Sequence, residues 1–253
     1  MELKKKKTQS GGDNLIGSGS SVSSTTLFAI KEAYKTIRTN LILNLDEKPC
    51  HIITITSSVA GEGKSTSSIN LAIAIAQFDK KVLMIDGDLR KKRASRYLKY
   101  HSTTGLTDVV RGEATFDNAI NVTKYPNFDF LSTGSTVTNP AEILASRAMN
   151  NLLDEISSRY DFIIIDTPPV NVVSDALPLI KKSDGVILVA RELVITTKDF
   201  NKLITNLQMI DAKILGVIYI GTDSTQPYYH GRSYYGRSYY HKYGKYSGYE
   251  TEQ

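Results

Sequence analysis

The hydrophobic residues of this 253-residue chain gather in short, nearly uninterrupted runs. An apolar run of about four to eight residues is typical of a strand that is buried on both faces, as in a parallel sheet. The runs span residues 52–55, 82–85, 162–165, 186–189 and 214–220, and residues 128–131 form a further candidate. These six segments are the predicted strands.

The stretches between the runs have helical spacing instead. Apolar side chains recur every three or four residues from 27 to 45, and helices are also predicted at 65–78, 141–158 and 197–209. Asn139 and Pro140 mark the start of one helix, and Glu142 is expected to complete a capping box there. Strands that alternate with helices predict an α/β fold, in which helices flank an open, mostly parallel sheet on both sides.

Composition divides the chain into three parts. Residues 1–24 are basic and then rich in serine and glycine, which predicts a disordered arm. Residues 25–222 carry the apolar runs and form the predicted folded domain. Residues 223–253 hold nine of the fifteen tyrosines but no aliphatic residue, so this segment is predicted to be a flexible tail.

Charge and cysteine content indicate the cellular compartment and the kinds of partner that the protein is expected to have. The net charge of +5 arises from 31 basic and 26 acidic residues, which favours a mixed soluble surface over a lipid-binding or nucleic-acid-binding patch. Cys50 is the only cysteine, so no disulfide can form within the chain and a reducing compartment fits. The sequence has no secretory signal and no apolar stretch near the roughly 20 residues that span a bilayer. We therefore expect a cytoplasmic protein that reaches a membrane only by docking.

The first apolar run leads into a phosphate-binding loop. Residues 57–66 read Ser-Ser-Val-Ala-Gly-Glu-Gly-Lys-Ser-Thr and end in the G-K-[ST] of a P-loop, although Ser58 stands where the strict pattern has its first glycine. Such a loop directs backbone N–H groups at phosphates, while the lysine bridges phosphates and the following hydroxyl ligates Mg²⁺. The alternative is a plain turn between a strand and a helix. The residues predicted to bind ATP are Ser58, Ala60, Gly61, Glu62, Gly63, Lys64, Ser65 and Thr66.

Two further runs end in aspartates. Asp86 and Asp88 follow run 82–85, and Asp166 follows run 162–165. Residues that follow parallel strands lie at the carboxyl edge of the sheet, where open α/β sheets bind ligands. We predict that Lys64 and these three aspartates are catalytic, and that Ser65, Asp88 and Asp166 support Mg²⁺. Asp86 is the predicted acceptor of a substrate proton, while a turn or a helix cap is the alternative for any single aspartate.

The ordered motifs resemble those of the bacterial tyrosine kinases, or BY-kinases. These proteins carry a Walker A loop, a Walker A′ motif (an apolar run and D-x-D-x-R) and a Walker B motif (an apolar run and D-x-x-P), and all three occur here. Residues 139–144 also resemble the family's N-P-x-E-L-L. The resemblance implies the P-loop NTPase fold, ATP and Mg²⁺ as cofactors, and autophosphorylation of the tail. The implied acceptors are Tyr228, Tyr229, Tyr234, Tyr235, Tyr239, Tyr240, Tyr243, Tyr246 and Tyr249.

The same resemblance implies partners. Residues Glu32, Lys35 and Arg38 are similar to the family's E-x-x-R-x-x-R subunit contact, with lysine in place of the first arginine. A ring-like homo-oligomer is therefore expected. The family's cytosolic Gram-positive type works with a separate membrane-anchored activator, a polysaccharide chain-length regulator, and controls capsular or exopolysaccharide synthesis and export. A cognate tyrosine phosphatase and recruitment to the inner face of the membrane are also expected, and nucleic acid is not.

Two other functions remain open on sequence grounds. A MinD- or ParA-type partitioning ATPase shares the predicted fold, but many of those proteins have a lysine where this chain has Val59. A nucleotide-gated assembly scaffold without significant kinase activity is the second. The tail itself could be a sticky low-complexity segment or an RNA-binding arm. The motifs of eukaryotic-type kinases are absent from the sequence.

Overall fold

The computed structural model describes residues 24–100 and 102–221. The predicted N-terminal arm, except for its last residue, and the tyrosine-rich tail lie outside this range. The strands are β1 (His51–Ser57), β2 (Val82–Asp86), β3 (Ile120–Val122), β4 (Phe128–Leu131), β5 (Phe162–Asp166), β6 (Gly185–Arg191) and β7 (Ile214–Ile220). The helices are α1 (Ser24–Leu43), α2 (Lys64–Ala76), α3 (Arg93–Leu98), α4 (Leu106–Val110), α5 (Phe116–Ala119), α6 (Pro140–Ala145), α7 (Arg147–Ile156), η1 (Ser174–Ala176), α8 (Leu177–Lys182) and α9 (Thr197–Gln208).

The seven strands form one sheet in the order β3-β4-β2-β5-β1-β6-β7. Every neighbouring pair is parallel except β3 and β4, which are antiparallel. All six predicted strands are present, and the predicted fold class is confirmed. The additional strand β3 has only three residues and none of them is fully buried, so it leaves no apolar run in the sequence.

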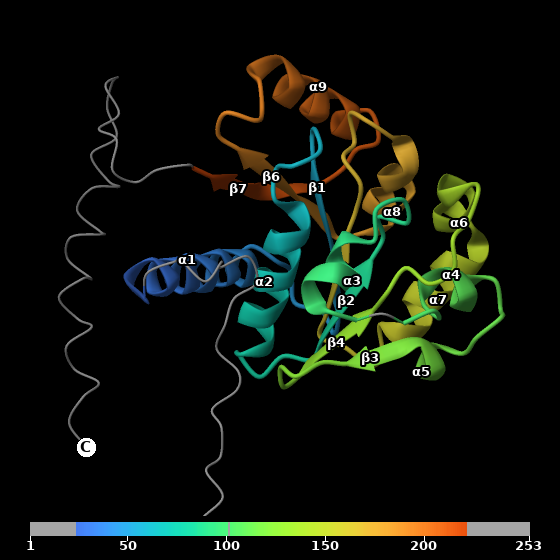
Figure 1. The fold of residues 1–253 in the computed structure, drawn as a ribbon. Helices are drawn as coiled ribbons and strands as arrows, with labels where there is room; N and C mark the ends of the chain where they lie inside the picture. The colour runs from blue at the N-terminus through green and yellow to red at the C-terminus, as the bar shows by residue number, and fades with distance from the viewer. Residues whose placement is uncertain (1–23, 101, 222–253) are drawn as a thin grey trace, which may run out of the picture.

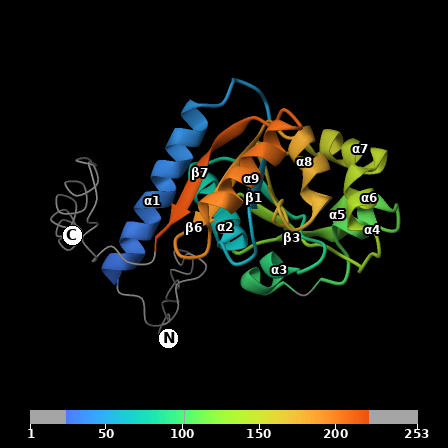
Figure 2. The ribbon, with the colours of Figure 1, turned by 90° about the horizontal axis from the view of Figure 1, so that it is seen from above.

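Helices cover both faces of the sheet, as the uninterrupted apolar runs predict. In β1, Ile53 and Ile55 face the core that α1 and α2 close, whereas Ile52 faces the core that α4, α7 and α8 close. A third apolar cluster joins β6 to α8 and α9. Figures 1 and 2 show α1 beside α2 and β7 at one end of the molecule, with α4 to α7 at the other end. Both faces of the sheet are therefore covered by helices.

Two local predictions are wrong. The helix predicted at 141–158 is divided into α6 and α7 at Ser146, which is extended (φ −69°, ψ 155°) and whose hydroxyl accepts a hydrogen bond from the N–H of Met149. The capping box at Asn139 does not form, because its side chain makes no capping hydrogen bond and instead donates to Glu142 Oε1 over 3.2 Å. In both places a local side-chain hydrogen bond produces a structure that differs from the one the sequence pattern predicts.

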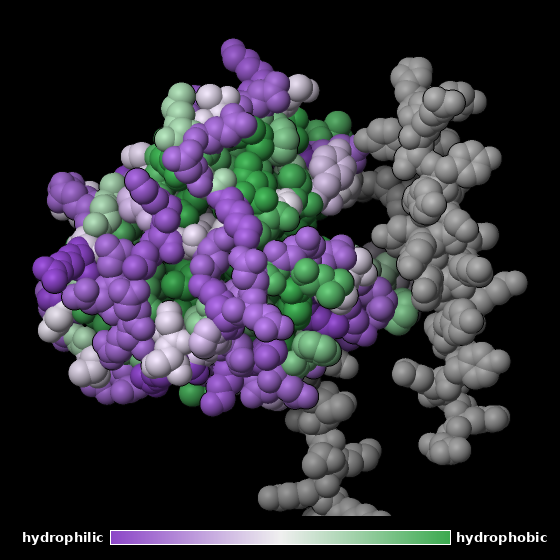
Figure 3. Space-filling view, turned by 180° about the vertical axis from the view of Figure 1, so that it is seen from behind, coloured by the Kyte–Doolittle hydropathy of each residue, from purple (hydrophilic) through white to green (hydrophobic). Residues whose placement is uncertain are grey.

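The surface carries charged and apolar side chains together. Seen from behind, it is mostly hydrophilic, with hydrophobic side chains showing between the polar ones (Figure 3). Among the described helices, none is both long enough and apolar enough to cross a lipid bilayer.

Candidate active site

The loop between β1 and α2 has the backbone that phosphate binding requires. Gly61 and Gly63 have φ angles of 93° and 91°, in the left-handed region that favours glycine. A Cβ atom on Gly63 would lie 2.6 Å from Ile220 Cδ1 at the end of β7. Gly63 also caps α2, so the loop leads directly into the positive end of a 13-residue helix.

Side chains within the loop hold its shape. Glu62 Oε2 accepts a hydrogen bond from Ser58 Oγ over 3.0 Å and one from the N–H of Val59 over 2.7 Å. Ser57 Oγ donates to the carbonyl of Val59 over 2.8 Å. The side chains of Ser58 and Glu62, both predicted to bind ATP, therefore face each other, which leaves phosphate contacts to the backbone and to the residues that follow.

The lysine of the loop is buried beside the carboxylates. Lys64 is the first residue of α2 and is 6% exposed. Burial lowers the pKa of its ammonium group, and the charges of Asp166 and Asp88 oppose that shift. Ser65 and Ser68, three residues apart on the same helix face, both hydrogen-bond to Asp166, and Ser68 Oγ does so over 3.2 Å. The P-loop helix and the end of β5 thus form one site.

The predicted aspartates converge as expected from parallel strands. In the register of β2 and β5, Asp86 lies opposite Asp166, and both are fully buried, while Asp88 is 4% exposed. Burial raises the pKa of Asp86, and the charges of Asp166 and Asp88 raise it further. Burial also raises the pKa of Asp166 to about 6, although Lys64 and the serines of α2 oppose the shift. The cluster therefore carries more buried negative charge than one lysine balances.

The same carboxylates fit a magnesium ion. Asp86 Oδ1, Asp88 Oδ1 and Asp166 Oδ2 are buried and have no hydrogen-bond partner among the described residues. Hard oxygen ligands of this kind suit Mg²⁺, which usually retains water and takes its other ligands from phosphates. Within residues 24–100 and 102–221, no group of three or more His, Cys, Asp or Glu side chains could hold a metal ion alone. The three unpartnered carboxylate oxygens are the described groups that would support a magnesium ion at this edge of the sheet.

Residues outside the predicted catalytic and ATP-binding sets brace the site. Ser95 of α3 approaches Asp86 Oδ2 with its N–H and its hydroxyl, each at 3.4 Å. Arg90, from the D-x-D-x-R motif, binds both oxygens of the buried Asp175 at 2.6 and 3.1 Å. At the end of β6, Arg191 donates to the Gly61 carbonyl over 3.4 Å. Of these contacts, only the Arg90 brace had a sequence signal, since the others depend on loops that meet in three dimensions.

The predicted subunit-contact residues lie on α1, the helix that packs against α2. Glu32 and Lys35 form an exposed ion pair of 2.7 Å with each other. Arg38 donates to the carbonyl of Ala74 over 3.1 Å, and its guanidinium lies 4.7 Å from the ring centre of Phe78. Arg38 thus has an intrachain role at the end of α2. The nine predicted acceptor tyrosines lie outside the described residues.

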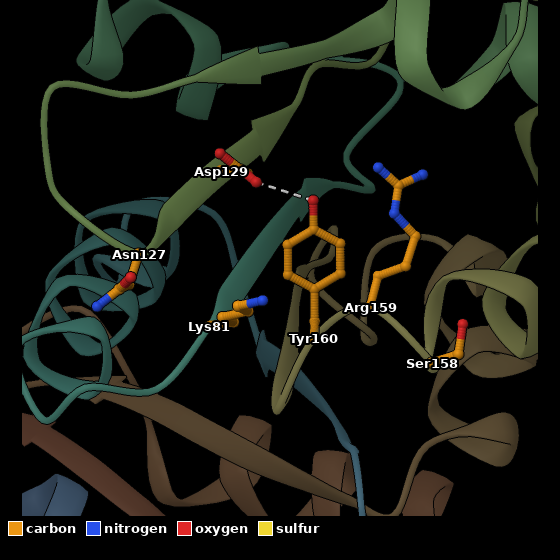
Figure 4. Close-up of a pocket in the computed structure, with 6 residues that line it drawn as sticks. All are labelled: Lys81, Asn127, Asp129, Ser158, Arg159 and Tyr160. Atoms are coloured by element: carbon orange, nitrogen blue, oxygen red, sulfur yellow. Dashed lines mark hydrogen bonds between the residues drawn. The ribbon is translucent and has the colours of Figure 1, made fainter.

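A separate hollow of about 440 Å³ lies at the opposite edge of the sheet (Figure 4), where β2, β4 and β5 begin. The residues that line it are Lys81, Asn127, Asp129, Ser158, Arg159 and Tyr160. The Tyr160 hydroxyl points at Asp129 and donates to Oδ2 over 2.9 Å. Burial and this bond to a carboxylate raise the pKa of the phenol. None of the predicted site residues lies there.

Comparison with known proteins identifies close relatives. Residues 50–218 match a family model described as an AAA domain. The tyrosine-protein kinase YwqD of Bacillus subtilis is 37% identical over 190 residues, which make up 75% of this chain and 80% of YwqD. The tyrosine-protein kinase CpsD of Streptococcus pneumoniae is 32% identical over 75% of this chain and 83% of its own length. The match to the kinase ptk of Acinetobacter johnsonii, 34% identical over 74% of this chain, spans only 26% of that longer relative.

Comparison with solved structures also finds similarity to a tyrosine kinase. The kinase domain of Escherichia coli tyrosine kinase ETK superimposes with a TM-score of 0.74 at 31% identity, covering 81% of this chain and 80% of ETK's. The chimerical protein CapA2B2 gives 0.71 at 35% identity, covering 75% and 83%. The septum site-determining protein MinD of Pyrococcus horikoshii, complexed with Mg-ADP, gives 0.58 at 28% identity over 67% and 70%. The ETK kinase domain and CapA2B2 thus each match over more of the chain than MinD does.

Proposed function

The chain belongs to the bacterial tyrosine kinases, and from this premise we propose that it transfers the γ-phosphoryl group of ATP to tyrosine hydroxyls, chiefly those of its own C-terminal tail. One observation carries the proposal. A buried lysine at the start of α2 and three buried aspartates share one edge of the sheet, and each aspartate has one oxygen without a hydrogen-bond partner among residues 24–100 and 102–221. Lysine and loop amides hold phosphate groups, and carboxylates support a metal ion and a proton.

The roles follow from where each group lies. Lys64 and the N–H groups at the start of α2 hold the phosphates. The Ser65 hydroxyl would be the direct protein ligand for Mg²⁺, and Asp88 and Asp166 would support the ion through water. When bound, magnesium neutralises charge on the phosphate oxygens during in-line transfer. The protein's own contribution is to hold these groups rigidly and away from bulk water, which is the main source of catalysis in phosphoryl transfer.

Asp86 is the group that accepts the phenolic proton. Its Oδ2 faces Ser95, while Oδ1 has no partner among the described residues and is free for a substrate hydroxyl. A phenol has a pKa near 10, so a nearby carboxylate is a weak base unless it is desolvated. Asp86 is fully buried, which makes its carboxylate more basic than an exposed one.

The position of the last strand supports the tail as a substrate. β7 ends at Ile220, whose side chain lies against the P-loop at Gly63, so the last described strand ends at the catalytic edge. Tyr228 follows Gly221 by seven residues, and seven extended residues span at most about 25 Å. Phosphorylation adds about −1.5 to −2 charges per tyrosine and would reverse the charge balance of the tail. We infer that the unmodified tail docks in a neighbouring subunit and that phosphorylation releases it.

The wider role rests on the family. We propose that this kinase acts in the cytoplasm at the inner face of the membrane, where a separate membrane-anchored activator recruits it and completes the site. The relative CpsD and the similar CapA2B2 chimera support this arrangement. Regulation of capsular or exopolysaccharide synthesis and export, ring assembly and reversal by a tyrosine phosphatase belong to the same proposal.

One experiment separates kinase from ATPase. The purified protein is incubated with Mg·ATP, with and without the cytoplasmic segment of its activator, and phosphotyrosine is located by mass spectrometry. We expect phosphate on Tyr228 to Tyr249 in the wild type and none in Lys64→Met. A chain truncated after Asp223 should bind ATP but lose most of the signal. ATP hydrolysis without phosphotyrosine under every condition would favour a MinD-like ATPase or a nucleotide-gated scaffold instead.

A further inference from the structure

The phosphate loop contains a buried acidic side chain that the proposed mechanism does not use. Glu62 is fully buried, as is Ser58, although glutamate is a residue type that is almost never fully buried unless it is paired. Both hydrogen bonds to Glu62 Oε2 come from the start of the same loop, from Ser58 Oγ and from the N–H of Val59. Through Oε2 the carboxylate thus closes the loop on itself across residues 58–62, while Oε1 is buried without a hydrogen-bond partner among the described residues.

We propose that Glu62 is a positioning residue that fixes the shape of the phosphate loop before the nucleotide binds, and that Ser58 is its matched hydroxyl donor. This assignment rests on the proposed nucleotide site. It explains why serine can replace the first glycine of the strict P-loop pattern, because the hydroxyl supplies a bond that glycine could not. Glu62 and Ser58 then act through the loop, and their side chains do not touch the phosphates.

The contacts around Val59 show how the closure works. Its N–H donates to Glu62 and its carbonyl accepts from Ser57 Oγ, so both polar groups of this residue's backbone are satisfied by side chains of the loop. The N–H of Val59 is therefore directed inward. The amides available to phosphate are those that follow, up to the start of α2 at Lys64. A loop that is already ordered loses less conformational entropy when the ligand binds.

Four variants test the assignment through nucleotide affinity, measured by calorimetry with Mg·ADP. Glu62→Ala removes both bonds to a charged acceptor, and we expect its Kd to rise by about 10- to 100-fold. Ser58→Ala removes one donor and should raise the Kd by about 3- to 10-fold. The double variant should bind no more weakly than Glu62→Ala alone, because the two residues act through one contact. Glu155→Ala, on the exposed face of α7, is the matched control and should bind as the wild type does.

Charge and geometry are separated by two conservative changes. Glu62→Gln keeps an acceptor oxygen at the same distance, so we expect it to restore affinity to within about threefold of the wild type. Glu62→Asp keeps the charge but shortens the side chain by one methylene, so it should bind as weakly as Glu62→Ala. The opposite order, with aspartate active and glutamine inactive, would overturn the assignment, as would an unchanged Kd in Ser58→Ala.

Kinetics add a readout that a general loss of structure would not produce. Ser58→Ala should raise the KM for ATP while its kcat at saturating ATP changes little, and Glu62→Gln should stay close to the wild type in KM. The melting temperatures of both variants should stay close to that of the wild type. A fall in kcat with unchanged KM would contradict the assignment. Because affinity for Mg·ADP is measured without turnover, the absence of phosphotyrosine in the wild type would count against the kinase proposal alone.

Discussion

The buried carboxylates should make the ligand-free protein less stable than it could be, and Asp166→Asn tests this. Asp166 is fully buried and its pKa is raised to about 6. A carboxyl with an unfolded pKa near 3.9 then binds protons more strongly in the folded state, so stability falls as pH rises from about 4 to above 6. At pH 7.5 the ionised form costs the folded protein up to roughly 3 kcal/mol. The attraction to Lys64 is already contained in this pKa. The asparagine amide, however, replaces one acceptor oxygen with a donor, so we expect a net gain of about 1–2 kcal/mol rather than the full cost.

The assay is thermal unfolding in EDTA, compared with the wild type at two pH values. At pH 7.5 the melting temperature of Asp166→Asn should rise by about 2–8 °C, and the gain should shrink at pH 5, where Asp166 is protonated in the folded wild type. The control, Asp161→Asn, removes a half-exposed partner of Lys80 at the opposite edge and should give no gain. Mg·ADP should stabilise the wild type but scarcely affect Asp166→Asn. A lower melting temperature for Asp166→Asn at pH 7.5, or a gain independent of pH, would refute this electrostatic reasoning.

Three further substitutions test individual parts of the site. Asp86→Asn should lower the rate of phosphotyrosine formation by about 10²- to 10⁴-fold while the Kd for ATP stays unchanged, and weaker ATP binding would argue against a role as base. Gly63→Ala should abolish nucleotide binding in calorimetry, because residue 63 has a left-handed backbone and the added Cβ would meet Ile220. Binding near the wild-type level would contradict this, since it would show that the loop can relax. Arg90→Ala should lower the melting temperature by about 2–4 °C, because it leaves the buried Asp175 unpaired. Arg90→Lys should recover only part of this loss, because an ammonium group cannot bind both carboxylate oxygens as a guanidinium does. Full recovery in Arg90→Lys would contradict the two-pronged contact.

The sheet could be predicted because its strands are buried on both faces. Runs such as 162–165 and 186–189 are apolar at every position, and each is a central strand. The elements that could not be predicted are short and lie at the margin of the domain. Strand β3 has three partly exposed residues, and α3 to α5 have four to six residues each, too few for helical periodicity to appear. Their positions depend on tertiary contacts rather than on local pattern.

The sequence predicted those residues of the candidate site that directly follow a strand. Asp86, Asp88 and Asp166 meet Lys64 because parallel strands bring their carboxyl ends to one edge. What the sequence could not indicate is which side chains face inward. Glu62 was expected to lie against the nucleotide, but its carboxylate is bonded to the start of its own loop. A linear motif specifies spacing, whereas the direction of each side chain depends on backbone angles that the motif does not encode.

The subunit-contact helix shows the same distinction on the outer surface. Glu32, Lys35 and Arg38 match one sequence motif, but on α1 they lie in two different environments. Glu32 and Lys35 are about half exposed and pair with each other, an arrangement that contributes little to the stability of a single chain. Arg38 holds the end of α2 through Ala74 and Phe78. If this helix contacts a neighbouring subunit, Glu32 and Lys35 can exchange partners at little cost, whereas Arg38 can do so only by weakening the packing of α1 against α2.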